Sequence, residues 1–229
     1  MAEGDLVVER ALDAGCTPVI ALIDAAKRPP VTDRFPADVP VFAGGDTLRA
    51  KVTQLGTPQG IVALFARPSR TSAEQLAQHA TRLIAVEAVD NPINIGSIVR
   101  NAVALGWDGM IFDATSADPL SRRSLRVSMG QAIAFPAARS GALPGDLRRL
   151  VEDGFAVCAL TPSADAEDIG AIPITTKMAI VIGSERAGLS AESLAASTHR
   201  VRIPMAPRID SLNAAAATAI ACYAFRSVR

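Results

Sequence analysis

The feature of this sequence that most constrains its fold is the regular alternation of apolar runs and helical patterns that begins near residue 82. The apolar runs cover residues 82–89, 109–114, 132–138, 155–161, 177–185 and 199–205. Strands that are apolar at nearly every position are buried on both faces, as in a parallel sheet that is covered by helices on each side. The pattern therefore predicts an α/β fold with a doubly covered parallel sheet.

The first third of the chain is less regular and predicts a smaller α/β domain. Residues 5–15 have helical spacing, residues 18–24 and 60–66 are apolar runs, and a helix with Asp46 as its N-cap is expected after residue 45. Residues 67–82 are polar and contain proline and serine, which is typical of a linker. We predict a small domain at 1–68, a linker at 69–82 and a larger domain at 83–229.

The composition limits the possible partners and the compartment. The chain has 23 basic and 23 acidic residues and a net charge of zero, so any contact with nucleic acid must come from a local basic patch. No apolar run reaches the roughly 18–20 residues of a membrane span, and the first residues do not resemble a signal peptide. The widely spaced Cys16, Cys158 and Cys222 lack metal-ligand spacing and are expected to be buried free thiols. We predict a cytoplasmic protein that needs neither membrane nor metal.

Three loops that follow predicted strands carry the residues best suited to chemistry, because open α/β sheets bind ligands at the carboxyl ends of their strands. In the first loop, residues 90–102, Asn94 can cap the next helix, and Arg100 lies about one turn beyond Gly96 among apolar neighbours. An arginine in this setting is either a surface residue or a functional one, and the local sequence favours neither interpretation.

The second loop covers residues 181–190. Gly183 allows close approach of the backbone to a ligand, Gly188 suits a positive φ, and Ser190 can cap the helix that follows. Glu185 is either a solvated loop acid, the more common case, or a group that binds substrate. The chain contains no G-x-G-x-x-G sequence, which argues against a dinucleotide-binding oxidoreductase.

The third loop covers residues 202–213 and leads into the helical sequence NAAAATAIA. Ser211 could simply cap this helix. A cap does not explain four consecutive alanines, which indicate that the helix packs closely against other segments on several sides. We therefore expect a crowded environment around the last helix.

Together the three loops resemble the three motifs of the SpoU (TrmH-type) RNA ribose methyltransferases, a branch of the SPOUT superfamily. The residues that resemble the first motif are Asn91-Pro92, Asn94, Gly96 and Arg100. Those that resemble the second motif are Gly183, Glu185 and Gly188-Leu189-Ser190. Those that resemble the third motif are Ile203-Pro204-Met205 and Ser211-Leu212-Asn213. The resemblance implies a parallel-sheet SPOUT domain with a deep C-terminal trefoil knot. A slim helix of alanines suits passage through such a knot.

The resemblance also implies a function: transfer of a methyl group from S-adenosylmethionine to the 2′-hydroxyl of a ribose in tRNA or rRNA. By resemblance, Arg100 acts at that hydroxyl, as a base or by positioning it, and Asn94 and Glu185 orient Arg100 or the substrate. Ser211 and Asn213 are implied to hold the methionine end of the donor. The implied cofactor-binding residues are Thr161, Gly183, Ile203, Met205 and Leu212.

The implied partners are RNA and a second copy of the chain. Arg122, Arg123 and Arg126 form the best candidate patch for RNA phosphates, and the homodimer interface is expected to include the first-motif helix or the last helix. The segments EGDLVVERAL and TPQGIVALFA resemble the small substrate-binding domain of many members, which usually has a further strand and helix before it. This difference suggests a shortened domain or a start codon that is assigned too late.

Two other functions are compatible with parts of the sequence. A non-catalytic RNA-binding relative is expected to lack Arg100 or the pair Ser211 and Asn213, and this chain has all three. Another nucleotide-binding α/β enzyme is suggested only by the alternation of strands and helices. The sequence leaves open which RNA and which nucleotide are modified.

Overall fold

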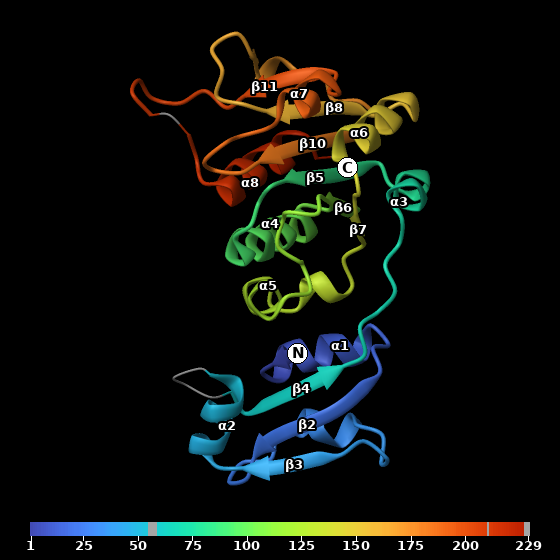
Figure 1. Cartoon of the computed structure of the whole chain (residues 1–229), viewed down its shortest axis with the longest axis vertical. Helices are drawn as coiled ribbons and strands as arrows, with labels where there is room; N and C mark the ends of the chain where they lie inside the picture. Colours follow the sequence, from blue (N-terminus) through green and yellow to red (C-terminus); the bar gives the residue numbers. More distant parts are fainter. Residues whose placement is uncertain (55–58, 210, 227–229) are drawn as a thin grey trace.

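A computed structural model of the chain describes residues 1–54, 59–209 and 211–226. It contains two sheets that lie toward opposite ends of the molecule, with α4 and α5 beside one and α1 and α2 beside the other (Figure 1). Within the described residues, no helix is long and apolar enough to cross a lipid bilayer.

The larger sheet is parallel throughout, which confirms the predicted fold class. Its seven strands lie in the order β7-β6-β5-β10-β8-β11-β9, and every registered pair is parallel. The strands are β5 (Arg82–Glu87), β6 (Gly109–Phe112), β7 (Ala137–Arg139), β8 (Ala156–Leu160), β9 (Glu167–Asp168), β10 (Met178–Gly183) and β11 (His199–Arg202).

Helices cover both faces of this sheet, and successive strand residues alternate between them. Ile84 and Val86 of β5 pack with α4, α5 and α8, whereas Leu83 and Ala85 pack with α3 and α6 on the other face. The helices are α3 (Ala73–His79), α4 (Pro92–Ala104), α5 (Arg122–Val127), α6 (Leu143–Glu152), α7 (Ala191–Ala195) and α8 (Ala214–Ala224). Burial on both faces is the physical reason why these strands are apolar at nearly every position.

The smaller sheet is mixed and lies in the first third of the chain. Its order is β1-β4-β2-β3, where β2 and β3 are parallel and the other two pairs are antiparallel. Its elements are β1 (Ala2–Glu3), α1 (Asp5–Asp13), β2 (Pro18–Asp24), the 3-10 helix η1 (Pro30–Arg34), β3 (Val41–Gly44), α2 (Asp46–Thr53) and β4 (Ile61–Phe65). Its buried side chains join the same apolar cluster as α4 and α8. The domain boundaries at 68 and 83 stay a prediction.

Two local predictions were wrong. Residues 132–138 were expected to form a strand, but η2 (Gln131–Ile133) is a 3-10 helix and β7 begins only at Ala137. Pro136 has no N–H to donate to a strand ladder, although its carbonyl accepts from Met110 N at 2.9 Å. Asp46 is the first residue of α2 rather than its N-cap, which is Gly45, and the Asp46 carboxylate instead accepts from Arg49.

The alanines of α8 are explained by its close packing against α4 and β10. Three side chains from other segments donate to carbonyls along α8 and just beyond it: Asn101 Nδ2 to Ala215 O at 3.1 Å, Trp107 Nε1 to Cys222 O at 3.1 Å and Arg82 Nε to Phe225 O at 2.8 Å. Bulkier side chains would hold these donors away from the backbone. The crowding expected around the last helix is found on the face that contains the buried Ala214 and Ala215, whereas Ala216 is exposed. The trefoil knot itself stays a prediction.

The cysteines differ in their environment. Cys158 and Cys222 are buried, and burial raises the pKa of Cys158 to about 12. Cys16 is only partly buried, so the prediction of three buried thiols was wrong for this residue. Cys16 lies three residues after the end of α1, in the turn that leads to β2.

Candidate functional site

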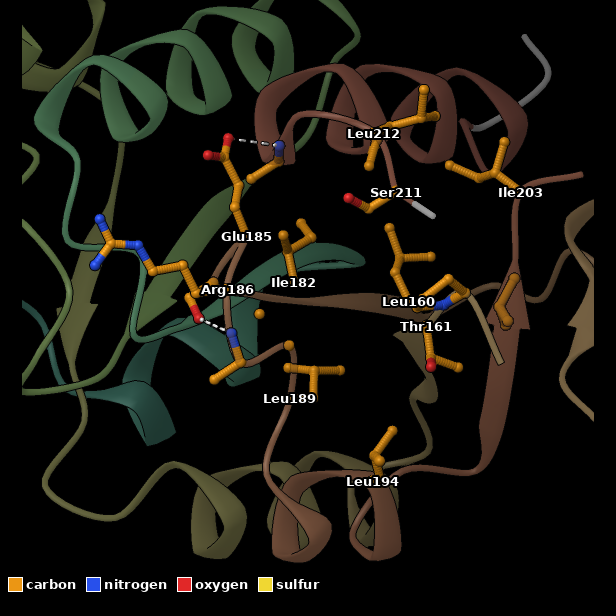
Figure 2. Close-up of a pocket in the computed structure, with 18 of the residues that line it drawn as sticks. Leu160, Thr161, Ile182, Glu185, Arg186, Leu189, Leu194, Ile203, Ser211 and Leu212 are labelled. Atoms are coloured by element: carbon orange, nitrogen blue, oxygen red, sulfur yellow. Dashed lines mark hydrogen bonds between the residues drawn. The ribbon is translucent and has the colours of Figure 1, made fainter. Parts of the chain in front are cut away.

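A cavity of about 460 Å³ lies at the carboxyl ends of β8, β10 and β11, where the sequence predicted a site. Figure 2 shows side chains from the loops after these strands converging on it from several directions. The predicted cofactor-binding residues all line the cavity: Thr161, Gly183, Ile203, Met205 and Leu212. Glu185 and Ser211 line it as well.

The rest of the lining could not be recognised in the sequence. The missed residues include Leu160, Pro162, Ile182, Leu194 and Val201. Most are aliphatic residues at the ends of strands or on a helix, and they resemble any other core residue until the fold leaves them facing an opening. They give the cavity the mainly apolar lining that is typical of small-molecule sites.

The wall after β10 depends on two glycines. A Cβ atom on Gly183 would lie 2.2 Å from the carbonyl carbon of Gly188, which is far inside van der Waals contact. Gly188 has a φ of +69°, which confirms the positive φ predicted for it, and its N–H donates to Ser184 O at 3.0 Å. The loop therefore folds back on itself and presents backbone rather than side chains at this wall.

Glu185 joins all three predicted loops: it is exposed, but its carboxylate is held by side chains from the other two loops. Its Oε1 accepts from Asn94 Nδ2 at 3.0 Å and from Asn213 Nδ2 at 2.6 Å. Asn213 Nδ2 also lies 3.1 Å from Asn94 Oδ1. In Figure 2 the Glu185 carboxylate points to the start of α8, where Ala214 N lies 3.4 Å from it. The positive end of the α8 dipole favours a carboxylate at this position.

The helix caps differ from the predicted ones. Asn91, not Asn94, caps α4 and accepts from Ile93 N at 2.9 Å, which leaves the buried Asn94 side chain for Glu185. Asn213, not Ser211, caps α8 and accepts from Ala215 N at 3.0 Å. Ser190 caps α7 as predicted.

Arg100 is not part of this cluster. It is exposed on α4, does not line the cavity, and has no hydrogen-bond or ion-pair partner among the described residues. It lies six residues after Asn94, about 9 Å further along the helix. Gly96, between them, has a packing role, because a Cβ there would lie 2.7 Å from Ser124 O of α5.

The three arginines of α5 are not equivalent. Arg122 Nε donates to the carboxylate of Glu3, whose side chain is only 3% exposed, and so links α5 to the small sheet. Arg123 and Arg126 are exposed, and neither has a side-chain partner among the described residues. Arg122 therefore forms an ion pair within the chain, whereas the side chains of Arg123 and Arg126 are free to contact RNA phosphates.

The residues present fit S-adenosylmethionine. The cavity volume is within the range of about 300–1,000 Å³ that is usual for cofactor sites. Its lining combines aliphatic side chains suited to an adenine ring with the exposed backbone of the Gly183–Gly188 turn. Arg186 extends away from the apolar side chains in Figure 2. Nowhere in the described part of the chain do three or more His, Cys, Asp or Glu side chains cluster as metal ligands.

Comparisons with known proteins identify the family of this chain. Residues 81–223 match the family model described as the SpoU rRNA Methylase family. An uncharacterized tRNA/rRNA methyltransferase of Mycobacterium tuberculosis is 38% identical over 97% of this chain and 79% of its own length. The 23S rRNA (guanosine(2553)-2′-O)-methyltransferase RlmP of Bacillus subtilis is 29% identical over 99% of this chain and 88% of its own length.

Among solved structures, the chain resembles an AdoMet-bound rRNA methyltransferase from Sinorhizobium meliloti. The TM-score is 0.85 at 29% identity, and the match covers 97% of this chain and 85% of that one. The SpoU methyltransferase AviRb from Streptomyces viridochromogenes, in complex with AdoMet, gives a TM-score of 0.83 at 25% identity over 97% and 87% of the two chains. The family match spans more than half of the chain and includes all three loops that meet at the cavity. The chain therefore belongs to the SpoU rRNA methylase family.

Proposed function

We propose that this protein is an S-adenosylmethionine-dependent RNA methyltransferase that modifies a ribose 2′-hydroxyl, with the donor bound in the cavity beside Glu185. The observation that carries this proposal is the junction at Glu185, where all three predicted motifs meet at one end of a cofactor-sized cavity. Relatives named as methyltransferases of rRNA or tRNA, one of them acting on a 2′-oxygen, support the same activity.

In this proposal each group of residues has a distinct task. The apolar lining and the Gly183–Gly188 turn bind the donor, and Ser211 holds its methionine end. Bound there, S-adenosylmethionine supplies an electrophilic methyl group on a sulfonium. Glu185 fixes Asn94 and Asn213, so that the start of α8 keeps its position beside the cavity. Arginine holds its proton in proteins, so Arg100 binds a phosphate and orients the 2′-oxygen.

We further propose that the working unit is a homodimer in which α4 and α8 form the interface. Large apolar side chains are exposed on both helices: Ile93 at 49%, Ile220 at 40% and Tyr223 at 58%. Arg100 is exposed on the same helix as Ile93 and lies outside the cavity of its own chain. We propose that a dimer through these helices places Arg100 beside the cavity of the partner.

The RNA surface is proposed to include Arg123 and Arg126 but not Arg122. Replacing Arg123 and Arg126 together with alanine is expected to weaken RNA binding and to reduce the slope of log affinity against log salt by about 1–2, since each phosphate contact contributes about 0.7–0.9. Arg122→Ala is expected instead to lower the free energy of unfolding by about 1–3 kcal/mol, because it leaves the Glu3 carboxylate buried without a partner.

Filter binding at several salt concentrations and urea unfolding of the same variants separate these effects. Equal losses of RNA affinity in the Arg122 variant and the double variant, without a loss of stability in the former, would contradict the assignment.

The cofactor is tested most simply by thermal unfolding with S-adenosylmethionine and with NAD. At a hundredfold excess over its dissociation constant, a ligand that binds only the folded state adds about 2.7 kcal/mol of stability. We expect S-adenosylmethionine to raise the unfolding temperature and NAD to leave it unchanged. Stabilisation by NAD alone would exclude the proposed function.

A further inference from the structure

A carboxylate that does not line the cavity holds one end of the cavity wall. Glu87, the last residue of β5, accepts three hydrogen bonds from a segment more than a hundred residues away. Its Oε2 accepts from Ser190 N at 2.9 Å, and its Oε1 accepts from Ser190 Oγ at 2.7 Å and Ser193 Oγ at 2.9 Å.

These bonds close the loop between β10 and α7 against β5. The loop begins at Gly183, which pairs with Glu87 in the parallel register of β5 and β10. It ends at Ser190, the N-cap of α7, which Glu87 binds through both its N–H and its hydroxyl. All residues from 183 to 189 line the cavity, so both ends of this wall are fixed at the same residue of β5.

We propose that Glu87 is a positioning residue for the methyl-donor site and acts through Ser190 and the loop before it. The inference rests on the proposed binding of S-adenosylmethionine in this cavity. Without the carboxylate, the N–H and hydroxyl of Ser190 lose their acceptor, and the wall can adopt other conformations before the ligand binds. The wall must then become ordered when the ligand binds, which makes the free energy of binding less favourable.

A carboxylate that binds the other end of β5 provides a matched control for the removal of Glu87. Asp108 Oδ2 also accepts three hydrogen bonds, from Thr81 N at 2.7 Å, Thr81 Oγ1 at 3.0 Å and Arg82 N at 2.9 Å. Asp108 directly precedes β6 and anchors the start of β5 as Glu87 anchors its end. It therefore lies at the amino ends of the strands, whereas the cavity lies at their carboxyl ends. Removing either carboxylate deprives three donors of their acceptor, and only Glu87 holds the cavity wall.

The experiment compares Glu87→Ala, Glu87→Gln and Asp108→Ala with the wild-type chain. It measures the dissociation constant of S-adenosylmethionine by calorimetry, the unfolding temperature, and amide hydrogen exchange of residues 184–190 without ligand. We expect both alanine variants to unfold at lower temperature. Only Glu87→Ala should bind the donor about tenfold or more weakly, the loss of roughly one hydrogen bond to a charged group, and exchange faster in the loop.

Glu87→Gln keeps the shape and one acceptor, so it should fold and give an intermediate affinity. If Glu87→Ala does not fold, the affinity of Glu87→Gln for S-adenosylmethionine tests the proposal. Wild-type affinity in the Glu87 variants that fold, or an equal loss of affinity in Asp108→Ala, would overturn the inference and leave the proposed function intact. Absence of binding by the wild-type chain would instead reject the proposed donor site.

Discussion

Replacing Arg100 with alanine is expected to abolish methyl transfer and to leave the affinity for S-adenosylmethionine nearly unchanged. Arg100 lies outside the cavity and has no partner among the described residues, so its removal disturbs neither the donor site nor a hydrogen-bond network. The loss of positioning at the hydroxyl should cost about 10²-fold or more in rate, because the reacting groups must be held in a near-attack geometry. Arg100→Lys should also be poor, because an ammonium cannot copy the planar fork of donors.

The matched control is Arg148→Ala, which removes an exposed arginine from α6 on the other face of the sheet. Single-turnover methylation of RNA by the folded variants is the measurement. If Arg100→Ala retains turnover within a few-fold of the Arg148 control, Arg100 has no part in the reaction.

A second prediction concerns Gly183→Ala, which should abolish binding of S-adenosylmethionine. The added Cβ would lie 2.2 Å from the carbonyl carbon of Gly188 and 2.5 Å from Leu189 N, so the turn must open. Forced shifts of this kind cost roughly 1–3 kcal/mol or more, and a movement of the wall should weaken donor binding by at least about a hundredfold.

The control for this variant is Gly145→Ala on α6, where a Cβ meets nothing within 4 Å. Calorimetry and thermal unfolding of both variants check the prediction. Normal affinity in a folded Gly183→Ala protein would place the donor elsewhere.

The two variants also test the proposed dimer when they are combined. In a mixed dimer, the Arg100→Ala chain supplies one intact cavity and the Gly183→Ala chain supplies one intact Arg100. In the proposed dimer these two lie together and form one working site. Random pairing would then restore about a quarter of the wild-type activity, since half of the dimers are mixed and each has one working site. No recovery after confirmed subunit exchange would mean that Arg100 and the cavity act within one chain.

Much of the fold could be predicted because the large sheet is buried on both faces. Continuous apolar runs such as β5 and β10 have no other stable location in a protein of this size. The prediction failed at residues 132–138, where the run is equally apolar but Pro136 cannot extend a ladder. Hydrophobicity identifies burial there, and backbone chemistry decides the secondary structure.

The site was predictable as a set of loops but not as a set of contacts. Pro92 is favoured at the first position of a helix, so the local sequence did carry a signal for Asn91 as the cap of α4. The bond between Asn94 and Glu185 had no such signal, because Glu185 is distant in sequence. Arg122 resembles its neighbours until Glu3 is placed beside it. Glu87 is a single acid at the end of an apolar strand, and no local pattern reveals the two serines that it binds.

The most direct test of the central claim is the chemical identity of the product. The purified protein is incubated with S-adenosylmethionine labelled in its methyl group and with tRNA and rRNA from cells that lack the protein. The RNA is then digested to nucleosides and examined by mass spectrometry. We predict label in one 2′-O-methylated nucleoside, absent with the Gly183→Ala protein. Label on a base, or none in either RNA, would contradict the proposed function.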